Sequence, residues 1–313
     1  MSDSEKVQLI RVLQPQEGQR LDNFLLRRLK GVPRSRVYWL IRRGEVRVNK
    51  KRCKPDRKLD FGDEVRIPPF ASGAEQKPGK PTPGLQELLL GCLLYEDEHL
   101  LVINKPTGLS VHGGSGVRLG LIEALRQLKP EWATLELAHR LDRDTSGCLV
   151  IAKTSEFLKQ IQTDLKEKRV QKRYYALVQG RWPEETTVVE APLLKNELSS
   201  GERIVRVARE GKPSLTRFTV LQRFTGATLV EAMPETGRTH QIRVHCQYAG
   251  HPIVGDSKYG AKGELDTLNR VKSLCLHAAS IRFAVPHLPA PLEVSAPVDK
   301  MLESVLASLE KEQ

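Results

Sequence analysis

The chain has 313 residues, of which 39% are hydrophobic and 28% are charged, and this composition excludes extensive disorder. Its 50 lysine and arginine residues against 38 acidic residues give a net charge of +12, which favours a polyanionic partner. No apolar run approaches the roughly 18 residues of a membrane-spanning helix, and residues 1–13 lack the pattern of a secretory signal.

The five cysteines argue against a disulfide framework and against a zinc knuckle. They include no C-x-x-C pair, and their number is odd. We therefore expect reduced thiols, packed mostly in cores, and a cytosolic protein. The length favours two domains, since one domain commonly takes about 100–200 residues.

The first domain is predicted over residues 1–70, and much of the positive charge lies in it. Residues 18–70 hold 16 basic and 6 acidic residues. Apolar spacing predicts helices over 20–26 and 34–43, and alternation predicts two strands around a basic turn. A solvated charged face is the alternative to phosphate binding. The candidate RNA-binding residues here are Arg34, Arg36, Arg42, Arg43, Lys50, Lys51 and Arg52.

A linker is predicted over residues 71–84, where three prolines and three glycines interrupt regular structure. The second domain is then expected over residues 85–313. Its patterns predict helices at 120–128, 156–168 and 301–313, and strands at 93–103 (a pair), 174–178, 214–224, 227–232 and 241–245. The fold class is therefore α+β, with a small α/β domain before a large domain built on a mainly antiparallel sheet.

A polar turn precedes a buried strand in the run AHRLDRDTSGCLVIAK, residues 138–153. It contains Arg140, Asp142, Arg143 and Asp144, and such crowding beside an apolar strand is common at functional sites. A capped turn with a salt bridge explains the same pattern. His240 and His245 lie five apart on a predicted strand and would face opposite sides, which argues against a shared metal ion.

Four motifs of the second domain resemble the A-type family of ribosomal large-subunit pseudouridine synthases. The signature H-R-L-D-x-x-T-S-G matches residues 139–147, and further blocks match at 104–113, 172–178 and 237–245, in the same order. Residues 20–55 resemble the S4 RNA-binding domain. Within the family the likeness is greatest to the C type, through KGVPRSRVYWLIRRGEVRVNKKR, VHGGSG and LLKNELSSGERIVRV.

The resemblance implies an isomerase that converts uridine to pseudouridine in large-subunit (23S) ribosomal RNA, free or in a pre-ribosomal particle. It implies Asp142 as the catalytic carboxylate, which attacks the sugar, stabilises a cation or abstracts a sugar proton. It also implies Arg243 as the bidentate partner of Asp142, Tyr174 as a stacking platform, and Arg140 as the side chain that replaces the flipped base. Asp144 would be either a second acid or a partner of Arg143.

The resemblance calls for no metal and no organic cofactor, and it implies a monomer. Two rival interpretations remain open. One is the same chemistry on transfer RNA or on another ribosomal site, and the other is a catalytically silent RNA-binding protein that assists ribosome assembly. The intact set Asp142, Tyr174 and Arg243 argues against the silent protein. Lys105 and His112 lie in a family-like loop with no assigned role.

Overall fold

The computed structural model describes residues 7–29, 32, 34–69, 79–113, 119–197, 203–260, 268 and 271–309. The chain separates into two units, residues 1–77 and residues 78–313. No helix among the described residues has the length and apolar character that crossing a bilayer requires.

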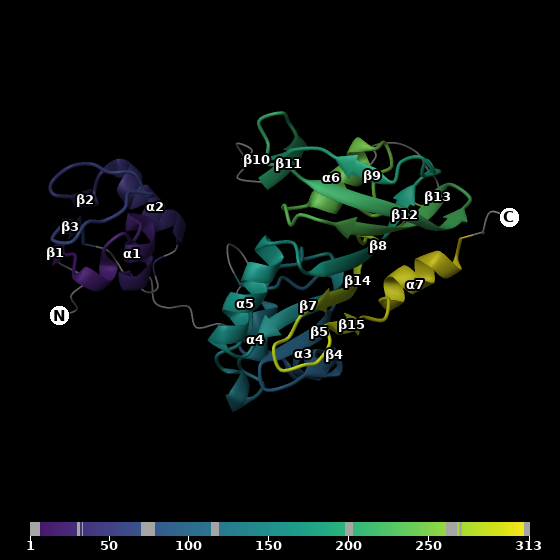
Figure 1. Cartoon of the computed structure of the whole chain (residues 1–313), viewed down its shortest axis with the longest axis horizontal. Helices are drawn as coiled ribbons and strands as arrows, with labels where there is room; N and C mark the ends of the chain where they lie inside the picture. The colour runs from purple at the N-terminus through teal and green to yellow at the C-terminus, as the bar shows by residue number, and fades with distance from the viewer. Residues whose placement is uncertain are drawn as a thin grey trace. The chain divides into compact units, whose positions relative to one another are not determined.

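The first unit packs two helices against a small antiparallel sheet (Figure 1). Its core comes from the apolar faces of both helices, including Leu21, Phe24, Val37 and Leu40, all of which are buried. The elements are β1 (Gln8–Arg11), a short 3-10 turn (Gln14–Gln16), α1 (Leu21–Arg28), α2 (Arg34–Arg43), β2 (Arg47–Val48) and β3 (Glu64–Ile67), with the sheet order β1-β3-β2. The two predicted helices and the strand pair are therefore present.

The second unit is built on one mixed sheet with the strand order β4-β5-β7-β14-β8-β13-β12-β9, and β6 and β15 pair with β7 and β14. Every pairing in it is antiparallel except that of β7 with β14. The predicted α+β class is confirmed. The strands are β4 (Leu93–Glu96), β5 (Leu100–Lys105), β6 (Glu136–Leu137), β7 (Ser146–Ala152), β8 (Gln171–Gln179), β9 (Val188–Glu190), β12 (Leu215–Phe224), β13 (Ala227–Pro234), β14 (Leu276–Phe283) and β15 (Leu292–Ser295), with a separate hairpin of β10 (Leu193–Glu197) and β11 (Arg203–Val207).

Helices of this unit are α3 (Pro83–Gly91), α4 (Leu121–Leu125), a 3-10 turn (Pro130–Trp132), α5 (Ser155–Lys166), α6 (Gln241–Tyr248) and α7 (Lys300–Ala307). Helix α3 begins inside the predicted linker of residues 71–84, because the Thr82 hydroxyl caps it and Pro83 suits a first helical turn. Helix α4 is shorter than the predicted helix 120–128, and α7 ends at Ala307, with 310–313 outside the described residues.

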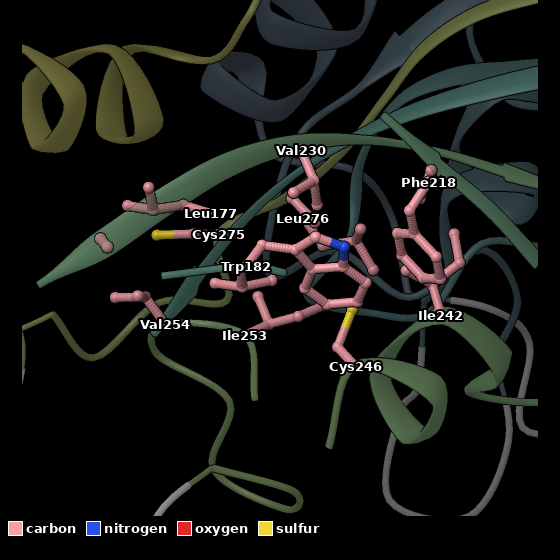
Figure 2. Close-up of a cluster of buried hydrophobic side chains, with 14 of the residues drawn as sticks. Leu177, Trp182, Phe218, Val230, Ile242, Cys246, Ile253, Val254, Cys275 and Leu276 are labelled. Carbon is pink, nitrogen blue, oxygen red and sulfur yellow. The ribbon is translucent and has the colours of Figure 1, made fainter. Parts of the chain in front are cut away.

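The predicted strand 241–245 is wrong, because these residues form the start of helix α6. His240 adopts a left-handed backbone conformation with φ of 53°, which turns the chain into the helix. Ile242 and Cys246, one turn apart, then point into the core around Trp182 and Phe218 (Figure 2). Burial of this face outweighs the strand preference of the β-branched residues.

Candidate active site

The polar turn between β6 and β7 is fixed to the loop after β5 by a buried lysine. Lys105 is fully buried, and its Nζ donates hydrogen bonds to the backbone carbonyls of Arg143 (2.8 Å), Leu109 (2.9 Å) and Pro106 (2.7 Å). Burial lowers the pKa of Lys105 to about 8, although nearby carboxylates counteract that shift. The loop, to which the resemblance assigns no role, therefore holds the turn that carries Asp142.

Gly147 lets this turn enter the sheet at its parallel pairing. Its φ is +106°, and a Cβ atom there would lie 2.2 Å from the carbonyl oxygen of Ala278 on β14. Only glycine fits so close an approach of two backbones. The final residue of the HRLDRDTSG run thus has a packing reason rather than a chemical one.

Arg243 of α6 reaches Asp142 across 101 positions of sequence, and its Nη1 lies 3.1 Å from Asp142 Oδ2. The expected bidentate pair between these two residues is wrong. Arg243 instead makes its two parallel hydrogen bonds to Asp256, from Nε to Oδ2 (2.7 Å) and from Nη2 to Oδ1 (2.8 Å). Burial opposes the charge of Arg243, but Asp256 and Asp142 outweigh it and raise the guanidinium pKa.

Asp256 was missed by sequence reasoning, although it completes the setting of Arg243. Its Oδ1 also accepts the backbone N–H groups of Lys258 (2.9 Å) and Tyr259 (3.0 Å). Burial alone would raise the pKa of Asp256, but Arg243 and these N–H groups lower it, so the pair is ionised. The run GDSKYG, residues 255–260, is a turn signal, but nothing in it indicates which helix the carboxylate would face.

A second flank of Asp142 is formed by His240, whose Nε2 lies 3.7 Å from the same Oδ2 atom. The Nδ1 atom of His240 lies 2.7 Å from the hydroxyl of Tyr259. His245, by contrast, is fully buried beside Ser214 and Thr216. The two histidines thus occupy different environments on the helix rather than opposite faces of a strand.

Asp142, Arg243, Tyr174 and Arg140 all line one pocket of about 1050 Å³ in the second unit. Tyr174 lies on β8 and is half-buried, and burial together with the charge of Asp142 raises its pKa, so the ring is neutral. Arg140 is exposed, and its side chain makes no hydrogen bond or ion pair to any described residue. The structure brings the four residues together, as the resemblance implies.

Asp144 pairs with its neighbour, since Arg143 Nε lies 2.8 Å from Asp144 Oδ1 on the exposed side of the turn. His139, at the start of the turn, accepts a hydrogen bond at Nε2 from the backbone N–H of Val150 (3.1 Å). Burial lowers the pKa of His139 to about 4, so this ring is a neutral acceptor. His139 therefore contacts β7, and Asp144 contacts its neighbour within the turn. Of the two aspartates, Asp142 is the one whose carboxylate contacts Arg243 of α6.

The expected RNA-binding residues of the first unit form an exposed basic surface on α2 and on the turn after β2. Trp39 lies between two of them, with the guanidinium of Arg36 3.9 Å and that of Arg43 4.7 Å from its ring centre. The side chain of Arg34 lies outside the described residues. The exposed members are Arg36, Arg42, Arg43, Lys50, Lys51 and Arg52.

The chemistry available in the pocket follows from the two oxygens of Asp142. Oδ2 faces both Arg243 and His240, whereas Oδ1 accepts no hydrogen bond from the described residues. Oδ2 is therefore held in place, and Oδ1 remains available to contact a substrate in the pocket. No group of three or more His, Cys, Asp or Glu side chains within the described ranges has the arrangement of a metal site.

Two family models match the chain, one for each unit. Residues 19–65 match the S4 domain, and residues 99–248 match the RNA pseudouridylate synthase family. The second match contains Asp142, Tyr174 and Arg243, but it ends before the turn that carries Asp256 and Tyr259.

Relatives extend the similarity over almost the whole chain. The ribosomal large subunit pseudouridine synthases C of Salmonella typhi and of Escherichia coli K12 are each 52% identical to it, and the alignments cover 98% of both chains. A solved structure, human RNA pseudouridylate synthase domain containing 4, matches with a TM-score of 0.61 at 28% identity. That match covers 74% of this chain and 97% of the human one.

Proposed function

Because the chain belongs to the RNA pseudouridylate synthase family, we propose that it converts uridine to pseudouridine in large-subunit ribosomal RNA, with Asp142 as its catalytic carboxylate. The reaction breaks the bond between C1′ of the ribose and N1 of uracil. The base then turns and rejoins C1′ through C5, while N1 gains a proton and the C5 hydrogen leaves as a proton. The protein is therefore an isomerase.

The asymmetric setting of Asp142 is the observation that carries the proposal. Arg243 Nη1 holds Oδ2 at 3.1 Å, which leaves Oδ1 unpaired among the described residues. Attack on C1′, stabilisation of a cation there, and abstraction of a sugar proton all need such a charged and accessible oxygen. The site supports each of these three routes.

Tyr174 and Arg140 support a substrate whose base has left the helix stack. A uracil inside a duplex is out of reach, so the enzyme has to extrude it. The neutral ring of Tyr174 on the pocket wall offers a surface for stacking, which contributes about 1–3 kcal/mol per base in other proteins. Arg140, exposed and without a partner among the described residues, is free to enter the space that the base leaves.

Exposed basic side chains at the pocket favour a polyanionic substrate. Lys166, Lys168, Lys195 and Arg238 line the pocket and are exposed, and phosphate contacts of this kind fix position and orientation. The S4 unit adds its own basic surface. The relatives that are 52% identical are named for the large ribosomal subunit, which supports large-subunit RNA as the substrate. The finer parts of the proposal are that the protein acts as a monomer and that its substrate is either the free RNA or a pre-ribosomal particle.

Tritium release from RNA labelled at uracil C5 tests the substrate, because pseudouridine formation frees that hydrogen. The protein is assayed on large-subunit ribosomal RNA, on its precursor particle, on small-subunit RNA and on transfer RNA. We expect release from the large-subunit RNA or its particle only. Release from transfer RNA alone would show that transfer RNA, not large-subunit RNA, is the substrate. Release from none of these RNAs would favour a catalytically silent RNA-binding protein.

A further inference from the structure

We propose that Tyr259 and His240 form a positioning pair, which orients the Asp142 carboxylate and links it to the β10–β11 hairpin. This inference rests on the proposed function, since it assigns a role around the same carboxylate. Tyr259 lies beyond the residues that match the family model, and neither residue has a role in the mechanism described above.

The contacts of His240 with Tyr259 and with Asp142 together favour one tautomer of its ring. The Tyr259 oxygen accepts the backbone N–H of Val205 on β11 (3.0 Å), and the same oxygen lies 2.7 Å from His240 Nδ1. Its one hydrogen can be donated to Nδ1, and this arrangement suits Asp142, because it leaves a hydrogen rather than a lone pair on the nitrogen that faces the carboxylate. The remaining ring hydrogen sits on Nε2, the atom that faces Asp142 Oδ2 at 3.7 Å. A hydrogen on Nε2 attracts the carboxylate, and the contact can shorten when substrate closes the site.

Both members of the pair are tightly held. Tyr259 is 3% exposed, its ring lies edge-on to His240, and the guanidinium of Arg243 lies 5.1 Å from its ring centre. His240 has the left-handed backbone conformation that begins α6, with φ of 53°. A non-glycine residue in that conformation is uncommon and marks a position that the surroundings over-determine. This conformation places the imidazole beside Asp142 at the start of the helix.

One turn thus supplies both supports of Asp142. Asp256 aligns Arg243 on one flank, and Tyr259, three residues later, aligns His240 on the other. Both flanks approach Oδ2, which leaves Oδ1 directed to substrate. Because Tyr259 also binds Val205, the position of the hairpin that carries the pocket residue Lys195 is coupled to the carboxylate. RNA bound against Lys195 would therefore help to align Asp142.

The pKa of His240 depends on its burial and on the charged groups around it. Burial lowers the pKa of His240 below its ordinary value. Among the charged groups that face it, Asp142 and Asp256 favour the imidazolium, whereas Arg243 and Lys258 oppose it. Tyr259 also opposes it, because its hydroxyl hydrogen occupies the Nδ1 lone pair. Removing that hydroxyl should let His240 take up a proton at higher pH.

Two variants separate positioning from packing. Tyr259→Phe keeps the ring over Arg243 and removes the hydroxyl, while His240→Asn keeps a residue that tolerates the left-handed backbone and removes the group facing Asp142. Tyr95→Phe is the matched control, since its hydroxyl bonds Asp97 (2.9 Å) and neither residue lines the pocket. Single-turnover tritium release is measured against pH, with RNA affinity and thermal melting for each protein.

We expect each site variant to lower the single-turnover rate by about 10- to 100-fold, with RNA affinity unchanged and Tyr95→Phe equal to the parent. Tyr259→Phe should move the acid limb of the pH profile to higher pH, and His240→Asn should remove the part of that limb due to His240. If both site variants react at the parental rate, the proposed positioning role is wrong. It is also wrong if the variants lose their cooperative thermal melt, because the contact would then serve folding alone. A parent protein that releases no tritium would overturn the proposed function and this inference with it.

Discussion

The Asp142 carboxylate differs from that of Asp144 in the side chains that surround it, although both lie on the same turn. Two aspartates stand two residues apart in the HRLDRDTSG run, yet only one faces a buried arginine. Asp144 forms an ion pair with its exposed neighbour Arg143, and such surface pairs contribute little to the free energy of unfolding. Asp142 instead contacts a buried guanidinium that Asp256 aligns, and both lie at the pocket.

At the residue scale, His139 provides a test of how the turn that carries Asp142 is held. Burial and, to a lesser degree, the nearby charge of Lys172 lower the pKa of folded His139 to about 4, against an ordinary value of 6.5. Between these values the unfolded chain binds a proton that the folded chain does not, so stability falls as pH falls from about 6.5 to 4. This linkage amounts to at most about 3 kcal/mol.

His139→Gln replaces the titrating acceptor by one that stays neutral. Urea unfolding of the parent and the variant at several pH values between 7 and 4 should show a smaller loss of stability in the variant. Parallel profiles for the two proteins would show that His139 titrates normally in the folded state.

Helix α6 shows what an element-level prediction can miss. Its sequence, QIRVHCQY, contains β-branched residues at alternate positions and therefore favours a strand in isolation. The left-handed conformation of His240 and the burial of Ile242 and Cys246 on one face decide for the helix. That choice also turns Arg243 toward Asp256, which takes the bidentate contact that the resemblance had assigned to Asp142.

The elements that sequence predicts well are those with one clear periodicity. Helix α5 has Phe157 and Ile161 on a buried face, and the hairpin of β12 and β13 follows a period of two. Asp142, Tyr174 and Arg243 were found through motifs. Asp256 and Tyr259 were not, because their partners lie on a helix whose orientation depends on tertiary packing. Sequence spacing alone carries no such information.

At the scale of the whole molecule, the chain divides its tasks between two units with separate cores. The first presents an exposed basic surface, and the second contains the pocket with Asp142. Helix α3 begins at Pro83, so the last two residues of the predicted linker 71–84 belong to a helix of the second unit.

Removal of residues 1–77 tests this division. We expect the remaining chain to bind large-subunit RNA at least about tenfold more weakly and with a shallower dependence on salt, because phosphate contacts are lost. Its turnover at saturating RNA should stay near that of the parent. Unchanged affinity and an unchanged salt dependence would show that the first unit does not target the enzyme.

The most direct test of the central claim is tritium release from C5-labelled large-subunit RNA by the parent, Asp142→Asn and Asp144→Asn. We predict that Asp142→Asn abolishes turnover while its RNA affinity stays within severalfold, because the charge serves the chemistry more than the binding. Asp144→Asn should retain most of the activity, since Asp144 pairs with exposed Arg143. Substantial turnover by Asp142→Asn, or its loss in Asp144→Asn instead, would contradict the assignment of Asp142 as the catalytic carboxylate.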